Sequence, residues 1–269
     1  MLGSVAPARF AIRVIGALAL VGAASACGSG GAVPTCVSGS AGCTSILFLG
    51  NSYTYVNDLP ATFARLSDSG GHRVNAQMVA NGGETLAQHA AAKESLDRIA
   101  AGGWSYVVLQ EQSQTPATDS GRDQMAAAAQ TLSRAAGAKG TPALLFMTPA
   151  HRDGMPEASL PDYASMQRAI DDAYLDVGRR LGLGSVPAGY VWFMVHQKHP
   201  GLSLWQDDGS HPSVAGTYLE ACVFYDSIFR QPAAGLAFID GLPDDEARAL
   251  QQAADDNVLS SLSDWGLPS

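Results

Sequence analysis

Residues 45–54 read SILFLGNSYT. The short apolar run SILFL at residues 45–49 is followed by a glycine and then by polar residues. Two further short apolar runs lie at residues 106–109 (YVVL) and 143–147 (ALLFM). Apolar runs of this length are typical of strands that are buried on both faces of a parallel sheet. The sequence therefore predicts three buried strands, the first of which leads directly into Asn51 and Ser52.

The segments between these runs have other periods. Residues 74–78 alternate between apolar and polar side chains, which predicts a half-exposed or edge strand. One apolar stripe at spacings of three and four predicts a helix through Met166, Ile170, Ala173, Tyr174, Val177 and Leu181. Because strand and helix alternate about four times, we expect an α/β fold, a three-layer α/β/α sandwich with a mainly parallel, flavodoxin-like sheet of about five strands.

Ligands of such folds bind beyond the carboxyl ends of the strands, so the polar residues at these ends are the candidate site residues. Gly50 permits a tight exit from the first strand and presents Ser52 at the sheet edge. The motif is not the G-x-S-x-G elbow of α/β-hydrolases, because Thr54 replaces its last glycine. After the second strand, residues 81–85 read NGGET, and a glycine there lets a backbone N–H approach a substrate oxygen. Taken alone, each motif is more typical of a plain turn.

The third strand is followed by QEQSQ at residues 110–114. Side-chain amides at this point can donate hydrogen bonds into the cleft, as the groups that stabilise an oxyanion must. A solvated loop is the alternative.

Near the end of the chain, residues 206–213 read QDDGSHPS. The proline after His211 favours an extended backbone at the histidine and suits the first turn of a helix that runs to Phe229. The dipole of that helix would oppose the formation of an imidazolium at His211. Asp208, three residues earlier, would offset this effect and orient one ring nitrogen, so that the other can take a proton from a serine. An incidental Asp-x-x-His loop is the alternative.

In this order and at these strand ends, the residues resemble the sequence blocks of the SGNH (GDSL) hydrolases, a superfamily of lipases and esterases. Its first block is Gly-Asp-Ser, its second contains a glycine, its third is Gly-x-Asn-Asp and its last is Asp-x-x-His. Ser52 matches the serine of the first block, and Gly83 matches the glycine of the second. Asp208 and His211 match the last block, and the resemblance extends from about residue 45 to residue 229.

The resemblance implies a catalytic triad of Ser52, His211 and Asp208. It also implies an oxyanion hole formed by the N–H groups of Ser52 and Gly83 together with one side-chain amide. The chain departs from the family at Asn51, which replaces the aspartate of the first block, and in the third block, whose asparagine is absent. We assign the third oxyanion donor to Gln112, and Ser113 and Gln114 are the alternatives.

These residues imply a serine esterase that hydrolyses carboxylic esters through an acyl-enzyme and that requires no metal or organic cofactor. The resemblance suggests O-acetyl groups on carbohydrates as substrates, because SGNH enzymes that face the membrane often remove them, and a lipid or another small ester is the alternative. A different class of function is a catalytically inactive, glycan-binding lipoprotein of the same fold on the cell surface.

Several other residues have alternative interpretations. His196 and His199 have the spacing of a metal-ligand pair but lack a third ligand at a recognisable distance, so loop or surface histidines are favoured. His151 follows the fourth strand and lies either in the cleft or in a loop. Glu111 and Asp208 would be a glycosidase-like carboxylate pair, which leaves Ser52 unexplained. The aromatic residues before the histidine loop form either part of the core or a sugar platform: Trp192, Phe193 and Trp205.

The first 26 residues have the features of a secretory signal peptide. They contain two arginines, no acidic residue, an apolar run too short to cross a bilayer, and Ala-Ser-Ala at the end. Cys27 follows, as in bacterial lipoproteins, in which this cysteine is lipidated. We therefore expect a signal peptide at residues 1–26, a Gly/Ser-rich tether at 27–44, and an SGNH hydrolase domain at 45–269. The expected location is outside the cytoplasm, anchored to the membrane only through a lipidated Cys27, or else secreted.

The net charge of the chain limits the classes of molecule that it is expected to bind. The net charge of −9 becomes −11 when residues 1–26 and their two arginines are removed, and an acidic protein of this kind is a poor partner for nucleic acid.

Cys36 and Cys43 flank a flexible loop in an exported chain, so we expect a disulfide, with two unpaired thiols as the alternative. Cys222 lies in a helical pattern and is expected to be a small buried apolar residue.

Overall fold

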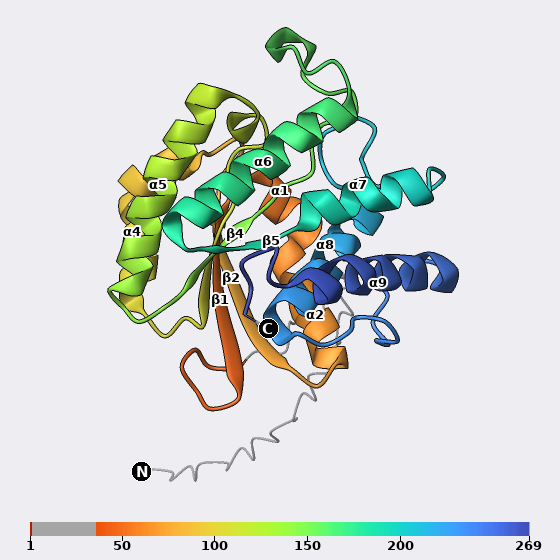
Figure 1. Ribbon diagram of the computed structural model, residues 1–269. Coiled ribbons are helices and arrows are strands. Elements are labelled where there is room, and N and C mark those ends of the chain that lie inside the picture. Colours follow the sequence, from red (N-terminus) through yellow and green to blue (C-terminus); the bar gives the residue numbers. More distant parts are fainter. Residues whose placement is uncertain (2–35, 269) are drawn as a thin grey trace. The chain divides into compact units, whose positions relative to one another are not determined.

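The SILFL run lies within β1 (Cys43–Gly50) of the computed structural model, which describes Met1 and residues 36–268 (Figure 1). β1 belongs to a five-stranded sheet with the strand order β2-β1-β3-β4-β5, and every pair of neighbours in it is parallel. The other strands are β2 (Arg73–Ala80), β3 (Tyr106–Leu109), β4 (Ala143–Phe146) and β5 (Gly184–Val186).

The register of the sheet brings the predicted motifs to one edge. Gly50 at the end of β1 pairs with Ala80 at the end of β2, and Leu49 pairs with Leu109 at the end of β3. Because the strands are parallel, the segments that follow them leave the sheet side by side. The turn that holds Ser52 therefore lies between the NGGET segment and the QEQSQ segment.

Helices cover both faces of the sheet (Figure 1). One layer contains α3 (Leu86–Ala91), α4 (Lys93–Ala101), α5 (Asp119–Gly137) and α6 (Tyr163–Leu181), which pack against one another in succession. The other contains α2 (Leu59–Ser69), α7 (Ala188–Lys198), α8 (Val214–Phe229) and α9 (Asp244–Val258). The single turn α1 (Ser52–Tyr55) and four 3-10 turns complete the described elements: η1 (Val56–Asp58), η2 (Thr115–Ala117), η3 (Pro156–Ala158) and η4 (Leu259–Ser261).

The core is thickest where α8 packs on the sheet. Residues 215–228 of this helix are all buried, and the ring of Phe224 lies 5.3 Å from that of Phe48 in β1 and 5.0 Å from that of Phe146 in β4. The helix is thus buried on all sides, including its acidic residues Glu220 and Asp226, and lies inside the protein. Its burial gives the loop that precedes it, which contains His211, a rigid support.

The predicted α/β/α sandwich with a parallel sheet is confirmed. The three apolar runs form β1, β3 and β4, and the alternating segment forms the edge strand β2. The stripe that begins at Met166 forms the buried face of α6. The sequence pattern did not identify β5, because three residues are too short to show a period.

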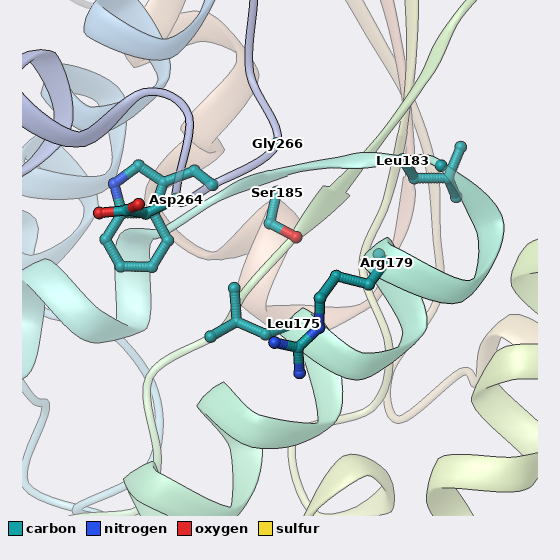
Figure 2. A pocket seen from close by; sticks show the side chains of 9 residues that line it. Leu175, Arg179, Leu183, Ser185, Asp264 and Gly266 are labelled. Carbon is teal, nitrogen blue, oxygen red and sulfur yellow. The ribbon is translucent and has the colours of Figure 1, made fainter.

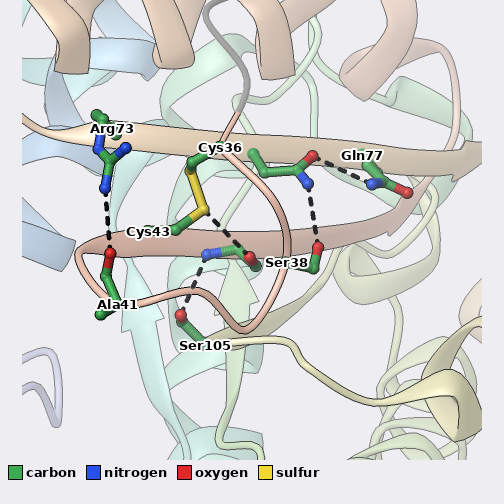
Figure 3. The surroundings of a disulfide bond; sticks show 9 residues. Cys36, Ser38, Ala41, Cys43, Arg73, Gln77 and Ser105 are labelled. Carbon is green, nitrogen blue, oxygen red and sulfur yellow. Dashed lines mark hydrogen bonds between the residues drawn. A yellow bond between two sulfur atoms is a disulfide. The ribbon is translucent and has the colours of Figure 1, made fainter.

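A disulfide joins Cys36 to Cys43 at the start of β1, as predicted (Figure 3). The loop that it closes is held against β2, because Arg73 donates a hydrogen bond to the Ala41 carbonyl and Asn75 donates one to Ser38. Cys222 is a buried free thiol, also as predicted. Residues 2–35, which include Cys27 and nearly all of the predicted signal peptide, lie outside the described part of the chain. Within the described part, no helix has the length and apolarity needed to cross a membrane.

Candidate active site

The structure brings Ser52, His211 and Asp208 together in one hydrogen-bonded line. Ser52 is the first residue of α1, and its Oγ lies 2.9 Å from Nε2 of His211. The other ring nitrogen of His211, Nδ1, lies 2.6 Å from Oδ2 of Asp208. Serine, imidazole and carboxylate are thus in contact in the order that nucleophilic catalysis by serine requires.

The carboxylate of Asp208 shapes the histidine loop as well as contacting the imidazole. Its second oxygen accepts hydrogen bonds from the backbone N–H groups of Ser210 (2.9 Å) and His211 (3.0 Å). The hydrogen bond with the His211 side chain, assisted by these backbone bonds, lowers the pKa of Asp208 to about 2. Asp208 therefore carries its charge at neutral pH, whereas Asp207 is exposed and makes no side-chain hydrogen bond to a described residue.

The helix after the loop begins later than predicted. Pro212 was expected in its first turn, but α8 starts at Val214, because the side chain of Ser213 accepts a hydrogen bond from the backbone N–H of Gly216 and caps the helix. Pro212 instead forms an isolated antiparallel β-bridge with Trp205. His211 consequently lies three residues before the helix, where the helix dipole acts on it only weakly.

Asn51 ties the turn that carries Ser52 to the NGGET segment. Its amide donates a hydrogen bond to the Glu84 carbonyl (2.9 Å), and its side-chain oxygen accepts hydrogen bonds from the Tyr53 N–H (3.1 Å) and from Gln110 (3.0 Å). An aspartate could not donate the first of these bonds. The departure from Gly-Asp-Ser therefore adds a direct link between two segments of the site.

Gln110 and His89 support the same turn from below. Fully buried Gln110 accepts hydrogen bonds from the Asn51 N–H (2.8 Å) and from the Thr54 hydroxyl (3.0 Å). His89, also fully buried, lies 2.9 Å from the Gly50 carbonyl through Nε2. No sequence pattern indicates the role of His89, which is an isolated histidine in the short helix α3.

The geometry distinguishes Gln112 from the other two candidates for the third oxyanion donor. The Oε1 atom of Gln112 accepts hydrogen bonds from the N–H groups of Gln114 (2.9 Å) and Thr115 (3.1 Å). This fixes the amide, and its Nε2 makes no hydrogen bond to any described residue. Ser113 is bonded to His151, and Gln114 does not line the cleft. Gly83, the proposed backbone donor, lines the cleft with a φ of 69°, a conformation that favours glycine.

Ser52 opens into a shallow cleft of about 370 Å³. Among the described residues, no aliphatic side chain lines this cleft, and the large apolar surfaces in it are the rings of Tyr53 and Tyr55. The lining residues are Asn51, Ser52, Tyr53, Tyr55, Gly82, Gly83, Gln112, Ser113, His151, Ser210 and His211. A separate hollow of about 220 Å³ lies between α6 and residues 264–266, and it contains none of the predicted site residues (Figure 2).

Two of the alternative interpretations are not supported by the geometry. Glu111 is buried outside the cleft wall, and its Oε1 accepts hydrogen bonds from the N–H groups of Leu86 (3.1 Å) and Gln112 (2.7 Å). Burial raises its pKa to about 7. Glu111 therefore positions the backbone and does not face Asp208 across a cleft. Trp192 and Trp205 are 0% and 6% exposed, so they belong to the core and not to a sugar platform.

The remaining histidines are also placed. His151 lines the cleft, which is one of the two interpretations of its position after the fourth strand. His196 packs edge-on against the rings of Tyr163 and Trp205. Within residues 36–268, no three histidine, cysteine or acidic side chains cluster closely enough to hold a metal ion.

Several solved structures of other proteins share this architecture. A candidate SGNH hydrolase from Slackia heliotrinireducens is 27% identical, with a TM-score of 0.56 over 68% of this chain and 98% of its own. A DUF4886 family protein from Bacteroides uniformis is 18% identical, with a TM-score of 0.65 over 81% of this chain and 95% of its own. Axe2, an acetylxylan esterase from Geobacillus stearothermophilus, is 18% identical, with a TM-score of 0.53 over 68% of this chain and 92% of its own.

No protein-family model matches the sequence, and no match was found among curated proteins. The likeness to the solved structures shows that the chain has the α/β fold of the SGNH hydrolases. A fold alone does not define a reaction, because the chemistry depends on the residues of the site.

Proposed function

We propose that this protein is a serine esterase that hydrolyses carboxylic esters by two-step acyl transfer. The observation that carries the proposal is the line from Ser52 Oγ to His211 Nε2 (2.9 Å) and from His211 Nδ1 to Asp208 Oδ2 (2.6 Å). Such contacts provide a nucleophile, a base within hydrogen-bond reach of it, and a carboxylate that orients the base.

In the proposed mechanism, His211 removes the proton of Ser52 as the serine oxygen attacks the ester carbonyl carbon. Asp208, ionised at neutral pH, stabilises the resulting imidazolium. The carbonyl oxygen gains negative charge and accepts hydrogen bonds from the N–H groups of Ser52 and Gly83 and from Nε2 of Gln112. His211 then gives its proton to the leaving alcohol, and water activated by His211 hydrolyses the acyl-enzyme.

The proposed substrates are O-acetyl groups on carbohydrates. A long acyl chain needs an apolar tunnel or groove, whereas the residues around Ser52 are polar, aromatic or glycine. A small acyl group and a hydroxyl-rich alcohol fit such a lining. Axe2, one of the proteins that share the fold, is an acetylxylan esterase, which supports the same choice.

The acyl-chain preference tests this function. We expect kcat/KM for p-nitrophenyl esters to be highest with acetate and to fall by at least about tenfold by octanoate, because burying each additional CH₂ is favourable only where apolar surface receives it. The series is measured with the wild-type protein and with Ser52→Ala as the background. Turnover that rises with chain length would contradict the choice of acetyl esters. Absence of turnover with every ester would favour the glycan-binding alternative.

We also propose that the protein is exported and anchored through Cys27, from the Ala-Ser-Ala-Cys sequence at residues 24–27. Mass spectrometry of the protein from a bacterial envelope fraction is expected to find an N-terminus at Cys27 that carries acyl chains. An unmodified Cys27 in the culture medium would contradict the anchor while leaving export intact.

A further inference from the structure

A second group of polar side chains lies in the cleft beside the triad, in two hydrogen-bonded pairs. His151 Nε2 lies 3.0 Å from Ser113 Oγ, and the Tyr53 hydroxyl lies 3.0 Å from Ser210 Oγ. All four residues line the cleft, and the proposed esterase mechanism uses none of them. Three of these side chains are neutral hydroxyls, and burial raises the pKa of Tyr53 to about 12, so its hydroxyl keeps its proton.

His151 is held in place from both sides along the chain. The preceding residue, Ala150, accepts a hydrogen bond from the Trp205 indole at its carbonyl (3.1 Å), and its N–H donates one to buried Gln167 (2.7 Å). The following residue, Arg152, donates its N–H to the Gly209 carbonyl (2.7 Å) within the histidine loop. The imidazole of His151 is therefore fixed relative to His211, which is the arrangement expected of a preorganised binding group.

One ring nitrogen of His151 is available to a ligand. Nε2 is bonded to Ser113, but Nδ1 makes no hydrogen bond to any described residue, and the ring is half-buried in the wall of the cleft. Burial and the neighbouring His211 lower the pKa of His151, so the imidazole is neutral at pH 7. A neutral imidazole nitrogen exchanges hydrogen bonds with a hydroxyl and does not attract an anion specifically.

The topology indicates which part of an ester reaches His151. Gly83 follows β2, Ser52 follows β1, Gln112 follows β3 and His151 follows β4, and the strands lie in this order in the sheet. The three proposed oxyanion donors therefore occupy one end of the cleft and His151 the other. His151 is also linked to the loop of His211, which in the proposed mechanism delivers a proton to the leaving alcohol. In that mechanism the alcohol of a bound ester, and not its acyl group, would extend toward His151.

We infer that His151, supported by Ser113, is a specificity-determining residue that binds a free hydroxyl on the alcohol portion of the ester, so that the preferred substrates are partially acylated polyols or sugars. The inference rests on the proposed esterase function. It adds a requirement that an ordinary esterase lacks, namely a second hydroxyl close to the esterified one.

Glycerol monoacetate and propyl acetate test this inference, because they share the acyl group and differ in the free hydroxyls of the alcohol. We expect the ratio of kcat/KM for the two esters to fall by about tenfold in His151→Phe, the effect of losing one neutral hydrogen bond. His151→Gln, whose amide can bond to a hydroxyl, is expected to recover part of the ratio. Ser113→Ala, which removes the partner of His151, is expected to lower it less.

The outcomes separate this inference from the function on which it rests. If neither ester is hydrolysed by the wild-type protein at any concentration, the esterase proposal fails. If both are hydrolysed and the ratio is the same in wild type, His151→Phe and Ser113→Ala, the assignment of His151 is wrong. The ratio is measured on one enzyme sample, so a variant that is partly unfolded lowers both rates together and leaves the comparison valid.

Discussion

Asp208→Asn is expected to lower kcat for acetyl esters by about 10²–10⁴, whereas Asp207→Asn leaves it within about threefold of wild type. An asparagine at 208 can still accept the N–H hydrogen bonds of Ser210 and His211, so the loop keeps its shape. Its NH₂ group, however, would face Nδ1 of His211 and favour the tautomer that carries the proton on Nε2. That nitrogen could then no longer accept the proton of Ser52.

The adjacent aspartate is the matched control, because both substitutions remove one negative charge from the same loop. Each variant is assayed at saturating substrate, and its circular dichroism spectrum is compared with that of the wild type. A large loss of kcat in Asp207→Asn, together with a near-normal kcat in Asp208→Asn, would contradict the geometry. Two mild phenotypes would show that His211 works without a carboxylate partner.

Gln112→Glu is expected to lower kcat by about 10²–10³ with a much smaller change in KM, the effect of losing one donor to the oxyanion. The glutamate keeps an oxygen that can accept the N–H groups of Gln114 and Thr115, so the segment keeps its capping bonds. The second carboxylate oxygen takes the place of the NH₂ group of Gln112 and repels the negative charge that develops on the substrate oxygen.

Gln114→Glu is the matched control for this substitution. It adds the same charge two residues away, at a side chain that does not line the cleft. Kinetic constants of both variants are measured with p-nitrophenyl acetate. Equal losses in the two variants would mean that charge alone slows the reaction, and Gln112 would then not be the third donor.

The sequence was sufficient for those elements whose pattern is local. Apolar continuity predicts β1, β3 and β4, and helical spacing predicts α6, because burial on two faces or on one stripe imposes these patterns on consecutive residues. The pattern does not reveal β5, which is defined by its pairing with β4. Nor does it reveal the start of α8, which depends on the capping bond of Ser213.

The same distinction applies to the candidate site. Ser52, Asp208 and His211 could be predicted because their order and strand-end positions together resemble the SGNH sequence blocks, whereas each motif alone is more typical of a turn. Gln110 and His89 could not, because their partners, Asn51 and Gly50, lie 59 and 39 residues away in the sequence. Gln112 was already assigned from the sequence, but the capping bonds at its side-chain oxygen, which favour it over its neighbours, are defined only in the folded chain.

The most direct test of the central claim, that Ser52 is a nucleophile activated by His211, is covalent labelling. A fluorophosphonate probe reacts with an activated serine hydroxyl and not with an ordinary one. Incubation of the purified protein with the probe, followed by peptide mass spectrometry, is expected to find one adduct, on Ser52. No adduct is expected in Ser52→Ala, and labelling is expected to be greatly slowed in His211→Ala. An intact Ser52 after prolonged exposure, or unchanged labelling of the Ser52→Ala variant, would contradict the account.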